Sequence, residues 1–296
     1  MSPAAGIAVL RLATRGSALA RAQAGLAAAA LEAVGGGASA QLVIVTTGGD
    51  RNKSTPIEQM EGQGWFTAEI ERSVLAGEAD IAVHSAKDLP TALAAGLEVV
   101  ALLPRGDPAD ALVTREGATL DLMPDGATVG SSSQRRSALL GAIRPGLRSV
   151  PIRGNVDTRL RKLDAGEVDG LLVAAAGLHR LGLSGRISER LDPRQFVPAP
   201  AQGAIALEAV AGSAAAGLAA AADDAATRLA VTCERAVMLA LGGGCLLPLG
   251  VWARLEGERL VISAALAADG SVARVEIGGD PASAAGLAER VAGALR

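Results

Sequence analysis

The sequence has almost no aromatic residues: two tryptophans, two phenylalanines and no tyrosine among 296 residues. Its core must therefore be built from alanine, valine, leucine and isoleucine. Because half of the residues are hydrophobic and only 20% are charged, the chain can bury a core and is not disordered. The net charge of -3 argues against general nucleic-acid binding, which needs a basic face. The length suits about two or three domains.

Cysteine and histidine are also scarce, which limits the kinds of site. Cys233 and Cys245 are too few for a disulfide scaffold and have no zinc-type spacing. His84 and His179 show no spacing for a metal or a catalytic pair, so we expect no metal site. Neither a signal peptide nor an apolar run of membrane-spanning length is visible, so we expect a cytoplasmic protein without membrane contact.

The most informative stretch is residues 81–91, IAVHSAKDLPT. An apolar strand runs into Ser85, Lys87 and Asp88, and Pro90 prevents a following helix. In open α/β sheets, ligands bind beyond the carboxyl ends of strands, where these side chains would lie. Taken alone, such a stretch is more often a solvated turn whose charged residues have no function.

The same design recurs along the chain and favours an anionic ligand. Residues 7–13 read as a strand that ends near Arg15, before a helix over 18–34 that Ser17 caps. A strand over 127–130 leads into a serine-rich turn and a helix, and a strand over 149–153 leads into a helix capped by Asn155. The basic and hydroxyl residues at these junctions are Ser131, Ser133, Arg135, Arg136, Arg153 and Arg159. Several arginines in a cleft imply a small polyanion, most simply a polycarboxylate, and no P-loop or GxGxxG motif points to a nucleotide.

The order of elements predicts three domains. Strands alternate with helices up to about residue 208, which predicts largely parallel, doubly wound sheets. One of these helices, over 66–76, should turn Ile70 and Val74 inward and Glu71 outward. After a helix over 227–241, three strands and a last helix predict a small α+β domain. We expect domain 1 to comprise 1–103 and 201–222, domain 2 to comprise 104–200 and domain 3 to comprise 223–296.

Cys245 is the second chemical signal. It follows three glycines, which argues for an exposed loop and for covalent attachment or nucleophilic catalysis. The alternative is a small buried apolar residue, which is the usual fate of a free cysteine and the one we expect for Cys233 within its helix.

Seven motifs, taken in order, resemble the porphobilinogen deaminase family, also called hydroxymethylbilane synthase. They are ATRGSALA (13–20), GQGWF (62–66), ADIAVHSAKDLPT (79–91), VGSSSQRR (129–136), IRGNVDTRL (152–160), AQGAIALE (201–208) and GGGCLLPLG (242–250). The resemblance implies two α/β lobes like those of periplasmic solute-binding proteins and an α+β third domain. It also implies a dipyrromethane cofactor held through a thioether to Cys245. The reaction would join four porphobilinogen molecules head to tail, with loss of ammonia, and hydrolysis would release hydroxymethylbilane.

The resemblance also implies roles for single residues. Asp88 would be the catalytic residue, stabilising positive charge on pyrrole nitrogens. The cofactor would be held by Cys245, Ser85, Lys87, Asp88, Ser131, Ser133, Arg135, Arg136 and Gly203. Substrate and the growing chain would contact Arg15, Gln23, Phe66, Arg153, Arg159 and Gln202. The chain departs from the family pattern at Gln63, often lysine, which changes the charge expected for the loop over 48–64. It also departs at Ala201, often glycine, which bears on the backbone shape before Gln202.

Two alternatives compete with this reading. A two-lobed binding or effector-sensing module would explain the arginines and the two lobes, but not Cys245. A transferase acting on another polycarboxylate would use Cys245 for a transient adduct only. We expect a monomer, because no long apolar surface stretch demands a partner.

Overall fold

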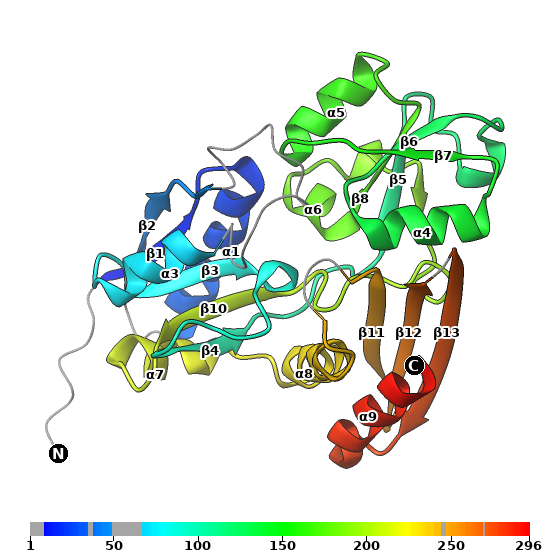
Figure 1. The fold of residues 1–296 in the computed structure, drawn as a ribbon. Coiled ribbons are helices and arrows are strands. Elements are labelled where there is room, and N and C mark those ends of the chain that lie inside the picture. The colour runs from blue at the N-terminus through cyan, green and yellow to red at the C-terminus, as the bar shows by residue number, and fades with distance from the viewer. Residues whose placement is uncertain (1–8, 35–37, 49–66, 244–246, 269) are drawn as a thin grey trace, which may run out of the picture. The chain divides into compact units, whose positions relative to one another are not determined.

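The computed structural model describes residues 9–34, 38–48, 67–243, 247–268 and 270–296. These residues form three sheets and divide into two compact units (Figure 1). The first unit contains the residues up to Arg105 together with Ala204–Arg228, and the second contains Gly106–Gly203 together with Leu229–Arg296. The expected limits of the three domains stay a prediction.

The first unit is built on a sheet with the strand order β2-β1-β3-β10-β4. Its strands are β1 (Val9–Arg15), β2 (Ser39–Val45), β3 (Ile81–Ser85), β4 (Leu97–Leu102) and β10 (Ile205–Val210). β1 runs parallel to β2 and β3, whereas β10 runs antiparallel to β3 and β4. The expectation of a largely parallel sheet is therefore wrong for β10. The chain re-enters at the carboxyl end of β3, where Ala86 N–H donates to Ala204 O over 3.1 Å, so no crossover helix precedes this strand.

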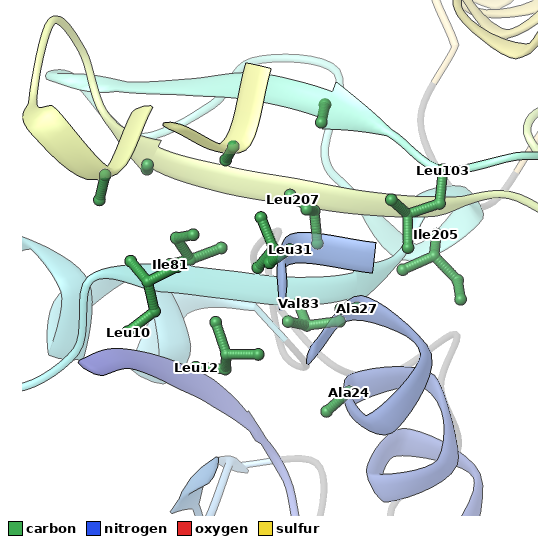
Figure 2. Close-up of a cluster of buried hydrophobic side chains, with 14 of the residues drawn as sticks. Leu10, Leu12, Ala24, Ala27, Leu31, Ile81, Val83, Leu103, Ile205 and Leu207 are labelled. Carbon is green, nitrogen blue, oxygen red and sulfur yellow. The ribbon is translucent and has the colours of Figure 1, made fainter. Parts of the chain in front are cut away.

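Helices cover both faces of this sheet because its buried side chains alternate. Leu10, Leu12 and Ile81 pack against Ala24 and Leu31 of α1 (Ala18–Val34), as Figure 2 shows. The same cluster includes residues of α7 (Ala214–Ala219). The helix over 18–34 begins and ends as expected, and Ser17 Oγ accepts the Ala20 N–H at 3.2 Å.

The opposite face is covered by α3 (Ala68–Leu75), whose Ile70 and Val74 pack on Ala13 and Ala82. Glu71 is buried too, so its expected outward orientation is wrong. Ser73, on the other side of Ile70 and Val74 around the helix, is buried as well, so the buried face of α3 is wider than these two residues alone.

In the second unit, a five-stranded sheet has the order β7-β6-β8-β5-β9. Its strands are β5 (Asp110–Thr114), β6 (Thr128–Gly130), β7 (Arg148–Val150), β8 (Gly170–Ala174) and β9 (Glu189–Arg190). β6 is parallel to β7 and β8, whereas β5 is antiparallel to β8 and β9. One face packs on α4 (Gln134–Ile143), and the other packs on α5 (Val156–Asp164) and α6 (Ala175–Arg180).

The C-terminal part forms an antiparallel sheet in the order β11-β12-β13. Its elements are α8 (Ala225–Ala240), β11 (Leu249–Glu256), β12 (Arg259–Ala268), β13 (Ser271–Gly279) and α9 (Ala284–Ala294). One face of the sheet packs on Val237 of α8 and Val291 of α9. The other face contributes Ala265 and Trp252 to the cluster that contains Leu139 of α4. The expected α/β class with a small α+β region is confirmed.

Candidate functional site

The turn after β3 exposes one carboxylate on a firmly held backbone. Residues Ala86–Asp88 form a single 3-10 turn, although Pro90 was expected to prevent any helix. Ala86 is buried and its N–H is bonded to Ala204 O, whereas Lys87 is half-buried and Asp88 is exposed. The carboxylate of Asp88 is therefore exposed on a turn whose first residue is bonded to the neighbouring chain segment.

Three more of the predicted residues lie at this edge of the first sheet. Gln23 Nε2 donates to Ser85 Oγ over 2.8 Å, and Ser85 Oγ lies 3.1 Å from Gln23 Oε1. This pairing joins α1 to the end of β3. Arg15 ends β1, the parallel neighbour of β3, so it lies at the same carboxyl edge. The location expected for these residues is confirmed, while their binding roles stay predictions.

In the second unit, a serine-rich turn lies beside the segment that carries Arg153. Ser131 N–H donates to Val150 O over 2.9 Å, and Ser132 Oγ donates to Ile152 O. Ser133 caps α4 by accepting the Arg136 N–H at 3.4 Å. Asn155 stands at the start of α5 but makes no capping hydrogen bond with its side chain.

Arg159 belongs to the same region. Its Nε donates to Gly154 O over 2.7 Å, which draws the first turn of α5 toward the residue that follows Arg153. The carboxyl ends of the parallel strands β6 and β7 thus gather serine hydroxyls and two arginines, as the sequence predicts.

Arg135 and Arg136 point into the protein and share one carboxylate. Arg135 Nη1 lies 2.6 Å from Asp110 Oδ2, and Arg136 Nη2 lies 2.7 Å from Asp110 Oδ1. The Asp110 side chain is fully buried, and the two arginine side chains are only 4% and 8% exposed. The same guanidiniums donate to Val197 O at 2.8 Å and Leu172 O at 3.1 Å.

The charges of this cluster do not cancel. Burial by itself would raise the pKa of Asp110, but the charges of Arg135 and Arg136 outweigh burial and hold that pKa well below its usual value. Two guanidiniums against one carboxylate leave a net charge of about +1 in a buried place. Arg135 Nε is also buried without a hydrogen-bond partner in the described part of the chain. This donor set fits a ligand that carries carboxylates, as the expected dipyrromethane does.

Gln202 and Gly203 complete the cluster from the returning chain. Gln202 Nε2 donates to Pro108 O at 2.8 Å and to Asp110 Oδ1 at 2.9 Å, and its Oε1 accepts from Arg136 at 3.3 Å. Gly203 has a φ of +91°, and a Cβ at this position would lie 2.7 Å from Gly106 O. Only glycine fits there, so its role in the structure is backbone shape.

Two predicted residues, Phe66 and Cys245, lie outside the described residues, as does Gln63. Cys233 is buried at 2% exposure within α8, as expected. Burial, assisted by the charge of Glu234, raises the pKa of this thiol to about 11, so it is a poor nucleophile at neutral pH.

Sequence reasoning missed the burial of four carboxyl groups and of a histidine. Besides Asp110, Glu208 lies 3.0 Å from His84 Nε2 with both side chains almost fully buried. Glu71 faces this pair, and burial together with the charge of Glu208 raises the pKa of Glu71. Glu234 is fully buried on α8. A lone charged residue inside an otherwise apolar strand was the signal for Glu208. Asp110 stands at the first position of β5, where the sequence gives no such signal.

The described residues contain neither a candidate metal site nor a candidate membrane-spanning helix. They contain no group of three or more histidine, cysteine or acidic side chains that could hold a metal ion. They also contain no helix long and apolar enough to cross a membrane.

Comparison with known proteins identifies the family. Residues 10–217 match the model "Porphobilinogen deaminase, dipyromethane cofactor binding domain", and residues 228–296 match "Porphobilinogen deaminase, C-terminal domain". A porphobilinogen deaminase from Acidothermus cellulolyticus is 45% identical over 302 residues, covering 100% of this chain and 91% of that protein. One from Xanthomonas campestris pv. campestris strain B100 is 45% identical over 289 residues, covering 97% of this chain and 95% of that protein.

Among solved structures, the VFT2 domain of BvgS from Bordetella pertussis aligns with a TM-score of 0.42 at 20% identity, covering 72% of this chain and 86% of that chain. The family models together span nearly the whole sequence, in the order in which the motifs occur. The chain therefore belongs to the porphobilinogen deaminase family.

Proposed function

We propose that this chain is a transferase that deaminates porphobilinogen and joins four molecules of it head to tail, yielding hydroxymethylbilane for tetrapyrrole and haem biosynthesis. The observation that carries the proposal is the match of both family models, in order, over nearly the whole chain. The named function of the relatives points to the same reaction. This match favours the deaminase over the two alternatives, which are a binding module without catalysis and a transferase for another polycarboxylate.

The dipyrromethane, when bound, supplies the primer onto which pyrrole units are joined. The residues that would hold its acetate and propionate groups are Ser85, Lys87, Ser131, Ser133, Arg135 and Arg136. Asp88 and Gly203 would also contact the cofactor, but not through its carboxylates. The net positive charge around Asp110 and the unpartnered Arg135 Nε support carboxylate binding at the second-unit residues. Because these guanidiniums are buried, an ionic contact to them is strengthened by the low local dielectric.

Asp88 is the catalytic residue in this proposal. Its exposed carboxylate would lie near the pyrrole nitrogen of the substrate and stabilise the positive charge that develops as ammonia leaves. It would also accept or return a proton while the new carbon–carbon bond forms, a role worth about 10²–10⁴ in rate. Its fixed 3-10 turn supports the role, since a preorganised charge costs no rearrangement during the reaction.

Six residues would contact substrate and the growing chain. They are Arg15, Gln23, Phe66, Arg153, Arg159 and Gln202. Each added pyrrole brings two more carboxylates, so several arginines suit a ligand that grows. We further propose three domains with the limits 1–103 with 201–222, 104–200 and 223–296, and a monomeric, cytoplasmic enzyme without nucleic-acid or membrane partners. Size-exclusion chromatography with light scattering tests the monomer.

The decisive experiment is the intact mass of the purified, acid-denatured protein. We expect an excess equal to two linked pyrrole units, bound through the thioether to Cys245. Cys245→Ala should lose that excess, whereas Cys233→Ala, the matched control, should keep it. Incubation with porphobilinogen should then add whole pyrrole units to the parent. A protein at its plain mass that also fails to consume porphobilinogen would refute the proposal.

A further inference from the structure

Glu234 of α8 bridges two backbone segments that are far apart in sequence. Its Oε2 accepts the Ala201 N–H at 2.6 Å, and its Oε1 accepts the Ala253 N–H of β11 at 2.8 Å. The side chain is fully buried. A carboxylate that is buried in this way is held by charge-assisted hydrogen bonds, which are short and about twice as strong as neutral ones.

Ala201 has a backbone conformation that alanine rarely adopts. Its φ is +62°, and it is the one non-glycine residue with positive φ in the described part of the chain. Gln202 N–H donates to Ala199 O over 3.0 Å, so residues 199–202 form a β-turn with Pro200 at the second position. A proline followed by a residue with positive φ is the pattern of a type II turn, whose third position favours glycine. The turn is therefore strained at Ala201, and something must hold it.

This turn sets the position of Gln202, the next residue. Gln202 Nε2 donates to Asp110 Oδ1, and Asp110 in turn binds both Arg135 and Arg136. An unbroken series of buried contacts thus runs from Glu234 through the turn to the two guanidiniums. A change in the turn would withdraw Gln202 from Asp110 and free the carboxylate to reorient between the arginines.

We propose that Glu234 is a positioning residue: by holding Ala201 in its left-handed conformation, it fixes Gln202 against Asp110 and thereby sets the geometry of Arg135 and Arg136. The inference rests on the proposed function in one respect, namely that these two arginines hold carboxylates of the cofactor. The same carboxylate also accepts the Ala253 N–H of β11, so Glu234 links the C-terminal sheet to the arginine cluster.

A double-mutant cycle with Ala201→Gly tests the inference. Glycine adopts positive φ without strain, so a chain with glycine at 201 should keep the turn even when Glu234 is altered. The four proteins are the parent, Glu234→Gln, Ala201→Gly and the double variant. The amide of Glu234→Gln has only one acceptor oxygen for two N–H donors. Glu234→Met, which has none, provides a second and stronger variant. Ala199→Gly, in the same turn but without positive φ, is the control for general loosening.

Three quantities are measured for each protein: the fraction that carries the cofactor mass, the KM and kcat for porphobilinogen, and the melting temperature. We expect Glu234→Gln to lower kcat/KM about ten-fold in the parent background. In the Ala201→Gly background, the loss of kcat/KM caused by Glu234→Gln should be at least three-fold smaller. The cofactor-bearing fraction should fall and recover in the same pattern. Ala199→Gly should give no such recovery.

Three results would overturn the inference. Equal losses in both backgrounds would mean that Glu234 does not act through Ala201. A lower melting temperature with unchanged KM and cofactor fraction would mean a structural role only. Equal recovery with Ala199→Gly would mean that any added flexibility relieves the defect.

Arg135→Gln and Arg136→Gln, measured alongside, separate this inference from the proposed function. If both arginine variants retain the parent's cofactor fraction and KM, the proposed role of the arginines fails, and the functional part of the inference fails with it. If the arginine variants lose cofactor or have a raised KM, but Glu234→Gln causes the same loss with alanine or glycine at position 201, the inference about Glu234 fails and the proposed function stands.

Discussion

Asp110→Asn should destabilise the second unit strongly, because it removes the carboxylate that two buried guanidiniums share. The parent carboxylate is fully buried between Arg135 and Arg136. Removing one partner of such a buried ion pair costs about 3–5 kcal/mol, since the remaining charge is left uncompensated. The asparagine oxygen still accepts one hydrogen bond, which places the expected cost at the lower end of this range. For a unit of this size, about 3 kcal/mol corresponds to a fall in melting temperature of roughly 6–12 °C.

The dependence on pH follows from the lowered pKa of Asp110. A carboxyl group whose pKa is lower in the folded than in the unfolded protein stabilises the fold above its unfolded pKa of about 3.9. This contribution is lost as the pH falls through the lower folded value. The difference between parent and Asp110→Asn should therefore be constant from about pH 5 to pH 8 and should shrink only below about pH 4.

The assay is thermal unfolding followed by circular dichroism at several pH values, with Asp107→Asn as the matched control. Asp107 pairs with Arg190 at 2.6 Å, but the arginine side chain is half exposed. Asp107 accepts two hydrogen bonds from Arg190 and one from the Ala109 N–H, so its replacement should cost somewhat more than the about 0–1 kcal/mol of a fully exposed pair, but less than the loss of a fully buried one. A fall of less than about 2 °C for Asp110→Asn, or a fall equal to that of Asp107→Asn, would refute the buried charge cluster as described.

Further predictions concern single side chains. Asp88→Ala should lose nearly all turnover of porphobilinogen with an unchanged melting temperature, because Asp88 is exposed; near-normal turnover would remove it from the mechanism. Arg153→Leu should slow chain elongation, and unchanged elongation kinetics in quenched-flow mass spectrometry would count against a binding role. His84→Ala should destabilise the protein by about 1–3 kcal/mol in urea titration, since it leaves a buried Glu208 oxygen without its hydrogen-bond partner at 3.0 Å; a cost below about 0.5 kcal/mol would contradict that. Cys233, whose thiol has a raised pKa of about 11, should resist alkylation by iodoacetamide at pH 8 in the folded protein and react only after unfolding, as peptide mass mapping can determine.

Local signals made much of the site predictable. The helix over 18–34 has the expected limits, because Ser17 caps its start and glycines follow its end. The positions of Arg15 and Asp88 at strand ends follow from apolar runs that stop at polar residues. Such features depend on neighbours in the sequence, which is why one sequence is enough to find them.

The features that escaped prediction depend on residues distant in sequence. The direction of β10 is set by where the chain returns beside β3. The burial of Glu71 depends on how closely α3 lies against the sheet. Asp110 meets Arg135 only because the antiparallel strand β5 brings its first residue beside the start of α4. No local pattern encodes these pairings, so propensity and periodicity could not reveal them.

The place of β10 between β3 and β4 in the first sheet has a consequence for how the chain is made. β4 is bonded in the sheet only to β10, yet roughly 100 residues of other structure separate the two in the sequence. At a ribosomal rate of about 5–20 residues per second, β3 and β4 wait roughly 5–20 s for the strand that joins them. During that time both have exposed edges, which are sites for aggregation. We therefore expect chaperones to bind the nascent chain most usefully between the synthesis of β4 and that of β10, when these strand edges are exposed.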